Sequence, residues 1–140
     1  MRFAETVLRI RTHTENIKNL SKMDLNNEII FNALAMECFQ TINSAIDLGE
    51  FVVSEKGLGF PSKYREIFEI LYSKKIIDKK ILECMKRLIF FRNVISHEYY
   101  RITKKELLKV IDLLDCVEQL TKSLKEYMKS SSKKFKSSNL

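Results

Sequence analysis

Residues 30–52 read IFNALAMECFQTINSAIDLGEFV, and their apolar spacing is that of a helix. Apolar or small side chains recur there every three or four residues: Ile30, Leu34, Cys38, Ile42, Ala45, Leu48 and Val52. Because a helix turns once in about 3.6 residues, this spacing places all of them on one face. We therefore predict a long helix that opens between Asp24 and Glu28 and packs this face against other helices.

The rest of the chain has the same helical character. The 140 residues include 3 glycines and 1 proline, whereas average usage would supply about 12% of the two together. This shortage argues against sandwiches, barrels and parallel α/β folds, which need frequent tight turns. We predict an all-α fold, an antiparallel bundle of four long helices plus one short helix. Besides the helix above, the expected elements are helices over about 2–20, from about 62, over 78–99 and from 103, with a reversal at 56–61.

Composition divides the chain into a helical domain over 1–128 and a basic tail over 129–140. The tail holds four lysines and no acid, so it carries four of the seven net positive charges. Having little to bury, it is expected to be disordered, with nonspecific attraction to polyanions as one use. The domain's own charge of +3 permits a nucleic-acid partner without requiring one.

The sequence bears on the cellular compartment and on the chemistry open to the protein through three features. These are the absence of a long uncharged apolar run, the cysteines and the histidines. No such run approaches the roughly 20 residues that cross a bilayer, and the N-terminus lacks the apolar core of a signal peptide. We therefore expect a cytoplasmic protein with no membrane partner.

Cys38, Cys84 and Cys116 form no C-x-x-C pair, and we expect three buried free thiols. His13 and His97 are too few for a multi-histidine zinc site, so we expect no metal and no cofactor.

Arg92 lies where an apolar side chain is expected. On the helical wheel of the predicted helix over 78–99, it falls between Leu88 and Met85, in the middle of the apolar stripe. Burying an unpaired guanidinium costs several kcal/mol, so this position requires a carboxylate, a phosphate or a wet cleft. One interpretation is a core arginine paired with Asp47 or Glu37 of the preceding long helix.

Other polar side chains gather near Arg92 on the same helix. Ser96 and Tyr99 share its face, Asn93 lies close to it, and His97 stands at the edge of that arc. A lone histidine is more often structural, but a polar constellation on one arc points to a groove that binds a ligand.

The chemistry open to these groups without a metal is narrow. A histidine can take a proton from a ribose 2′-hydroxyl or give one to a leaving 5′-oxygen, while an arginine stabilises charge on the phosphorus centre. One chain supplies only one suitable histidine, His97, because His13 lies in another helix. A site that needs an acid and a base would therefore borrow its second histidine from another copy, in a two-fold homodimer.

The sequence resembles a known family at this helix and before it. Residues 92–99, RNVISHEY, resemble the R-x4-H-x-Y signature of HepT toxins, a branch of the HEPN superfamily of all-helical domains. The GLGFP loop at 57–61, the YREIFEIL segment at 64–71 and the IID segment at 76–78 are similar to that family in the same order. The resemblance covers about residues 30–112. It departs from many relatives at Met36 and Glu37, where those carry Glu-Arg.

The resemblance implies a homodimeric, metal-independent endoribonuclease that cleaves RNA at a dimer-interface site. It implies the toxin of a type VII-like pair whose antitoxin is a cognate minimal nucleotidyltransferase. Arg92 and His97 would be the catalytic pair, with Asn93 and Ser96 in support, and Tyr99 the tyrosine that accepts AMP from the antitoxin. Two alternatives stay open: a non-catalytic HEPN module that binds nucleotides or serves as a scaffold for the nucleotidyltransferase, and a purely structural helical dimer.

Overall fold

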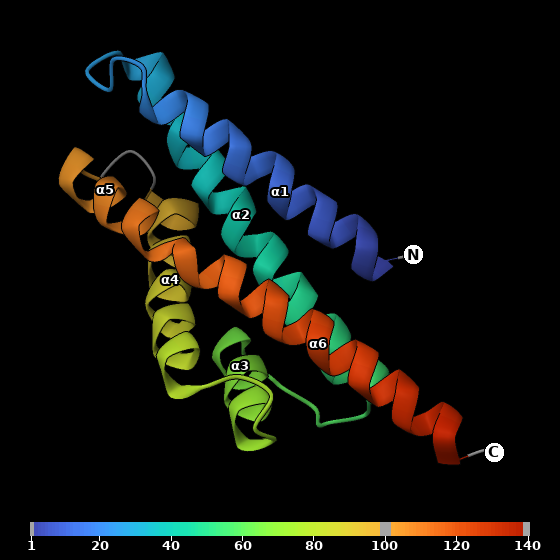
Figure 1. Cartoon of the computed structure of the whole chain (residues 1–140). Coiled ribbons are helices and arrows are strands. Elements are labelled where there is room, and N and C mark those ends of the chain that lie inside the picture. The colour runs from blue at the N-terminus through green and yellow to red at the C-terminus, as the bar shows by residue number, and fades with distance from the viewer. Residues whose placement is uncertain (1, 99–101, 139–140) are drawn as a thin grey trace.

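The computed structural model describes residues 2–98 and 102–138, without the side chains of 98 and 132–138. Within these residues every regular element is an α-helix (Figure 1). The helices are α1 (Arg2–Ser21), α2 (Glu28–Glu55), α3 (Tyr64–Ser73), α4 (Lys79–Glu98), α5 (Lys104–Leu113) and α6 (Asp115–Ser138). The all-α helical bundle predicted from the sequence is confirmed, with α3 as the short helix that follows the glycine-proline loop.

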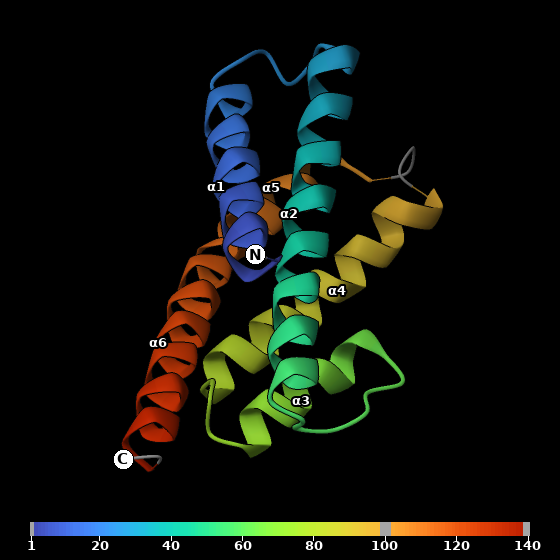
Figure 2. The same ribbon diagram turned by 90° about the vertical axis from the view of Figure 1, so that its right-hand side faces the viewer.

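The helix over the quoted stretch, α2, is the centre of the bundle. It contacts each of the other five helices, and α1 runs back alongside it as the other arm of a hairpin (Figures 1 and 2). Leu34, Ile42 and Leu48 of its predicted stripe are fully buried. Among the described helices, α2 alone is long and apolar enough to span a membrane, but its apolar face is already covered by the bundle.

Close packing at Gly49 brings α3 onto α2. A Cβ atom at Gly49 would lie 3.0 Å from side-chain atoms of both Ile67 and Phe68 of α3. A larger residue at this position would therefore push α3 away, and with it the start of α3 at Tyr64.

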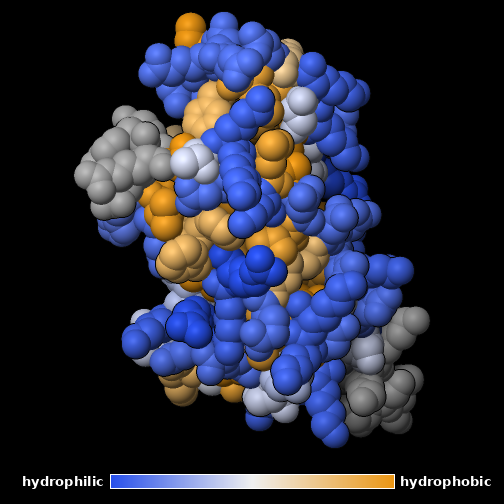
Figure 3. All heavy atoms as spheres, turned by 90° about the vertical axis from the view of Figure 1, so that its left-hand side faces the viewer, coloured by the Kyte–Doolittle hydropathy of each residue, from blue (hydrophilic) through white to orange (hydrophobic). Residues whose placement is uncertain are grey.

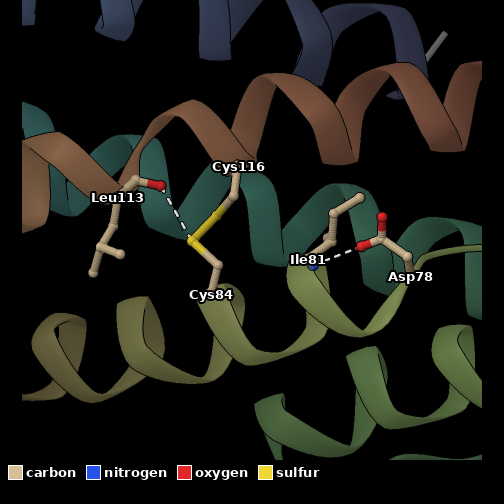
Figure 4. Close-up of a disulfide and its surroundings, with 5 residues drawn as sticks. All are labelled: Asp78, Ile81, Cys84, Leu113 and Cys116. Carbon is tan, nitrogen blue, oxygen red and sulfur yellow. Dashed lines mark hydrogen bonds between the residues drawn. A yellow bond between two sulfur atoms is a disulfide. The ribbon is translucent and has the colours of Figure 1, made fainter.

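Side-chain caps mark the starts of α4 and α5. Asp78 Oδ1 accepts a hydrogen bond from the Ile81 amide of α4 at 2.8 Å (Figure 4). At α5, Thr103 and Glu106 form a reciprocal capping box, which satisfies two amide groups that a helix start leaves unpaired. Both starts agree with the sequence prediction.

The last predicted helix is in fact two. The sequence predicts one helix from Thr103, but the structure divides it at Leu114 into α5 and α6. The Leu114 amide bonds the Ile111 carbonyl at 3.1 Å, and the Val117 amide bonds the Leu114 carbonyl at 3.0 Å. These three-residue hydrogen bonds tighten the chain locally. No glycine or proline marks the junction and the apolar spacing continues through it, so the periodicity could not reveal the break.

The backbone of α6 continues to Ser138, whereas the sequence predicts disorder from residue 129. The segment contains no glycine or proline, and lysine is a good helix former, so no local signal ends the helix at 128. The structure thus differs from the prediction in the path of the backbone over residues 129–138.

Two of the three cysteines are joined. Cys84 of α4 and Cys116 of α6 form a disulfide, with their Cα atoms 6.5 Å apart (Figure 4). The prediction of a free thiol is therefore wrong for these two, and it is confirmed for Cys38, which is free and buried. The bonded cysteines lie 32 residues apart, and only the packing of α6 on α4 brings them together. Cys84 Sγ also lies 3.2 Å from the carbonyl oxygen of Leu113, at the end of α5.

Candidate active site

Two amide side chains hold the guanidinium of Arg92. Its Nε donates to Asn43 Oδ1 of α2 at 2.8 Å, and its Nη1 donates to Asn93 Oδ1, one position along α4, at 3.0 Å. The arginine is half-buried, whereas Asn93 is exposed. The predicted closeness of Arg92 and Asn93 is thus a direct contact.

Two aromatic rings complete this setting. The Arg92 guanidinium carbon lies 5.3 Å from the ring centre of Phe39 on α2 and 5.1 Å from that of Tyr64 at the start of α3. At these distances the face of an aromatic ring attracts a cation. Rings and amides fix the guanidinium without neutralising its charge.

The carboxylates proposed as partners for Arg92 are engaged elsewhere. Asp47 lies 3.7 Å from Arg9 of α1, and Glu37 lies 2.6 Å from His13 of α1. Among the described side chains, no carboxylate is within ion-pair distance of Arg92. The interpretation of Arg92 as a core arginine paired with Asp47 or Glu37 is therefore wrong, and the charge stays available to an anion.

Hydrogen bonds at the start of α3 fix the chain just before and after Tyr64. The Ser62 amide donates to Glu66 Oε2 at 2.7 Å, and the Ser62 hydroxyl contacts both carboxylate oxygens of Glu66. The Ser62 amide first, and then its hydroxyl, lower the pKa of Glu66, because they stabilise the charged form. At neutral pH Glu66 is ionised and anchors the turn from which Tyr64 reaches Arg92.

The remaining predicted site residues do not join this cluster within one chain. Ser96 and His97 are both exposed, and His97 has no hydrogen-bond partner in the described part of the chain. His97 comes five positions after Arg92, which turns it roughly 140° away around α4. The structure thus brings Arg92 and Asn93 together but directs His97 to another side of the helix. Tyr99 lies outside the described residues.

The side of α4 that carries His97 also presents an apolar group to solvent. Phe90 is 64% exposed and precedes His97 by seven residues, so the two share a face. Figure 3 views the side of the molecule on which α4 and α5 lie and shows apolar patches between polar side chains. A large contiguous apolar patch is typical of a surface that contacts another molecule, whereas a single exposed apolar side chain is ordinary.

Three contacts of Arg92 were not found by sequence reasoning. Phe39 and Asn43 were not singled out, and Tyr64 was noted only as part of the 64–71 segment that resembles the family. Phe39 and Asn43 stand four residues apart on α2, so they lie on one face. That spacing was the available signal, but only the crossing of α2 and α4 shows which residue it serves.

A family model supports the same reading of the chain. The model described as "Ribonuclease HepT-like" matches residues 3–127. The chain belongs to the HepT-like family. The family predicted from residues 92–99 and from the preceding loop is therefore confirmed.

Solved structures show the HepT-like fold at low sequence identity. A cytosolic protein of unknown function, YutE from Bacillus subtilis, superposes with a TM-score of 0.83 at 21% identity, covering 92% of this chain and 90% of that one. A tri-AMPylated Shewanella oneidensis HEPN toxin in complex with an MNT antitoxin gives 0.82 at 16% identity, covering 89% and 97%. A mutant of a toxin–antitoxin MntA–HpeT structure gives 0.79 at 16% identity, covering 90% and 99%. Among curated proteins, no sequence matches the chain.

Proposed function

We propose that this chain is a metal-independent endoribonuclease toxin that acts in the cytoplasm. The observation that carries the proposal is the charge of Arg92, held by rings and amides and paired with no described carboxylate, on the same helix as the exposed His97. An unneutralised guanidinium in a fixed position suits a phosphate group. The HepT-like family match adds the substrate class, RNA.

The proposed reaction is internal transesterification of RNA. One histidine removes the proton of a ribose 2′-hydroxyl, whose oxygen attacks the adjacent phosphorus and forms the 2′-O–P bond. The P–O5′ bond breaks, and a second histidine gives its proton to the departing 5′-oxygen. Arg92 stabilises the extra negative charge on the phosphorus centre. The products are a 2′,3′-cyclic phosphate and a free 5′-hydroxyl.

A homodimer supplies the second histidine. His97 and Phe90 share the exposed face of α4, so a two-fold contact through this face would cover the phenylalanine and bring two copies of His97 together. Asn93 orients Arg92 through its hydrogen bond, and Ser96 lies between the arginine and the histidine. The active site is thus proposed to be composite.

A nucleotidyltransferase partner is proposed to control the site through Tyr99. Support comes from the neighbour whose HEPN toxin is tri-AMPylated and complexed with an MNT antitoxin. The Tyr99 phenol oxygen would attack the α-phosphorus of ATP, and pyrophosphate would leave. The attached phosphodiester would then compete with RNA for Arg92.

Cleavage of a labelled RNA by the purified chain, in excess EDTA, tests the nuclease. We expect cleavage to persist, the new 3′ ends to carry cyclic or linear phosphate, and His97→Ala to slow cleavage about 10²- to 10⁴-fold. Loss of activity on chelation, with recovery in magnesium, would contradict the mechanism. Absence of cleavage while nucleotides still bind would favour a non-catalytic partner of the nucleotidyltransferase.

Intact mass spectrometry after incubation with the partner enzyme and ATP tests the control step. Tyr99→Phe is expected to receive no AMP and to stay active, whereas the neighbouring Tyr100→Phe is expected to be modified and silenced. AMP-sized additions on the Tyr99→Phe protein would refute the assignment.

A further inference from the structure

A groove adjoins Arg92 on the side of α3. It has a volume of ≈ 520 Å³ and lies between the end of α2, the start of α3 and the middle of α4. Two of its lining residues, Tyr64 and Asn93, also contact the Arg92 guanidinium. A molecule in the groove would therefore be next to an anion held by Arg92.

The side chains that line the groove suit a flat heterocycle. Ile67 and Ile89 line it and are 1% and 3% exposed, which gives it an apolar floor. Tyr64 is 41% exposed beside them, and its ring offers a surface for stacking. Proteins that bind single-stranded RNA stack its bases on aromatic side chains in this way.

One acidic side chain gives the groove a polar preference. Glu50 of α2 lines it, and no side chain in the described part of the chain pairs with its carboxylate. An ionised carboxylate only accepts hydrogen bonds, through two oxygens. The Watson–Crick edge of guanine presents two adjacent N–H donors, at N1 and N2, that match both oxygens, whereas the other three bases do not offer such a pair.

Basic residues at the rim favour the RNA backbone. Lys63 and Arg65 line the groove on the α3 side and are exposed. Their charges would attract the phosphates that flank a bound base. The groove thus combines a stacking ring, a donor-selective carboxylate and a cationic rim beside Arg92.

We propose that this groove binds a guanine of the substrate RNA next to the scissile phosphate and makes cleavage selective for that base. The inference rests on the proposed nuclease function for its cleavage consequence. The Glu50 carboxylate reads the guanine edge, Tyr64 stacks on the base, and Arg92 holds the adjoining phosphate.

Mapping of cut sites tests the selectivity. Single-stranded RNA with a randomised segment is cleaved by the native protein, by Glu50→Gln and by Glu55→Gln, and the new ends are sequenced. Glu55 is a matched control, because it is an exposed glutamate of the same helix outside the groove. We expect guanine at one fixed position beside the cut, an enrichment about tenfold smaller in Glu50→Gln, and no change in Glu55→Gln. Cleavage without a guanine preference, or a preference that Glu50→Gln leaves intact, would overturn the proposal.

Binding of nucleotides separates the groove from the nuclease. The His97→Ala protein is titrated with GMP, AMP, CMP and UMP, and amide chemical shifts are followed. We expect GMP to bind most tightly and Glu50→Gln, in the same background, to remove that advantage. Selective GMP binding without any cleavage by the native chain would contradict the nuclease proposal and support the guanine-binding groove. Cleavage with equal binding of all four nucleotides would support the nuclease and contradict the guanine-binding groove.

Discussion

The α1–α2 hairpin and helix α4 each carry one of the two histidines, and the surroundings of the two side chains are opposite. His13 of α1 lies 2.6 Å from a Glu37 oxygen, and Asn16 donates to the other oxygen at 3.2 Å. On α4, His97 is exposed and pairs with no described side chain, while Arg92 has rings and amides but no described carboxylate around it. Polar groups that satisfy one another hold two helices together, and those that do not are free to meet a ligand.

Exchanging the two histidines for alanine should give the largest contrast. We expect His97→Ala to slow RNA cleavage about 10²- to 10⁴-fold, the usual range for a general acid or base. His13→Ala should cleave at nearly the native rate, since its ring pairs with Glu37 inside the hairpin. Single-turnover rates on a fluorescent RNA, with both variants checked for helical content, measure the contrast. Equal losses of cleavage rate in the two variants would contradict the assignment of a catalytic role to His97 and a structural role to His13.

The two regions also differ in how they are held, because a covalent link ties α4 to α6. The Cys84–Cys116 disulfide restricts the unfolded chain, and a closed loop of this size is worth about 3 to 4 kcal/mol in the chain-entropy treatment. We expect the paired variant Cys84→Ala/Cys116→Ala, or the reduced protein, to unfold at correspondingly lower urea concentration. An unchanged urea midpoint on reduction would show that the link adds no stability.

Reduction should leave the contacts of the site in place. With Cys84 as a thiol, its Sγ can donate to the Leu113 carbonyl oxygen 3.2 Å away, so the packing of α4 on α5 suits both redox states. In a reducing cytoplasm the thiol form would prevail. Cleavage is therefore expected to persist in reductant, measured on the same RNA.

A smaller effect should follow from breaking the hairpin's own polar cluster. Glu37→Ala leaves half-buried polar groups of His13 and Asn16 without their acceptor, which typically costs about 1 to 3 kcal/mol. We expect lower stability in urea and native cleavage rates. Met36→Ala is the control, because this neighbouring side chain is 51% exposed. A loss of cleavage with unchanged stability would show that Glu37 acts in the active site and does not stabilise the hairpin.

The contacts of Glu37 and of Arg92 show how far the fold and the site could be predicted from the sequence. Local patterns predicted the stripe of α2 and the helix starts at 78 and 103, where the structure has the Asp78 cap and the Thr103 capping box, because each depends on residues within one or two turns. The polar arc around Arg92 was also visible on a single helical wheel. Its partners were not, because Asn43 reaches it from another helix.

The disulfide and the α5–α6 junction escaped prediction for the same reason. Cys84 and Cys116 sit at helical positions that an apolar residue could fill, and only the crossing of α4 and α6 makes them neighbours. At Leu114 the apolar spacing continues although the hydrogen bonding changes. Glu37, which departs from the family pattern together with Met36, pairs with His13, and His13 lies outside the stretch that resembles the family.

The third cysteine, Cys38, extends the comparison of the two regions to chemical reactivity. It is fully buried in α2, and burial, reinforced by the neighbouring Glu37 carboxylate, raises the pKa of its thiol to about 12. Only the thiolate reacts with iodoacetamide, so native Cys38 should stay unmodified at pH 8. Below about pH 9 the Cys38 thiol is protonated in both the folded and the unfolded chain, so the contribution of its raised pKa to folding stability is fully present. As the pH rises from about 9, where the unfolded chain ionises, towards 12, that stability is lost.

Counting carbamidomethyl groups by intact mass compares Cys38 with the pair that joins α4 to α6. Without reductant we expect no label on the folded protein and one label in guanidinium chloride, because only Cys38 is then both free and exposed. With reductant in guanidinium chloride we expect three. Rapid labelling of Cys38 in the folded protein would mean that the core around α2 opens readily. Three labels in guanidinium chloride without reductant would mean that Cys84 and Cys116 are thiols, and that α4 is held to α6 by packing alone.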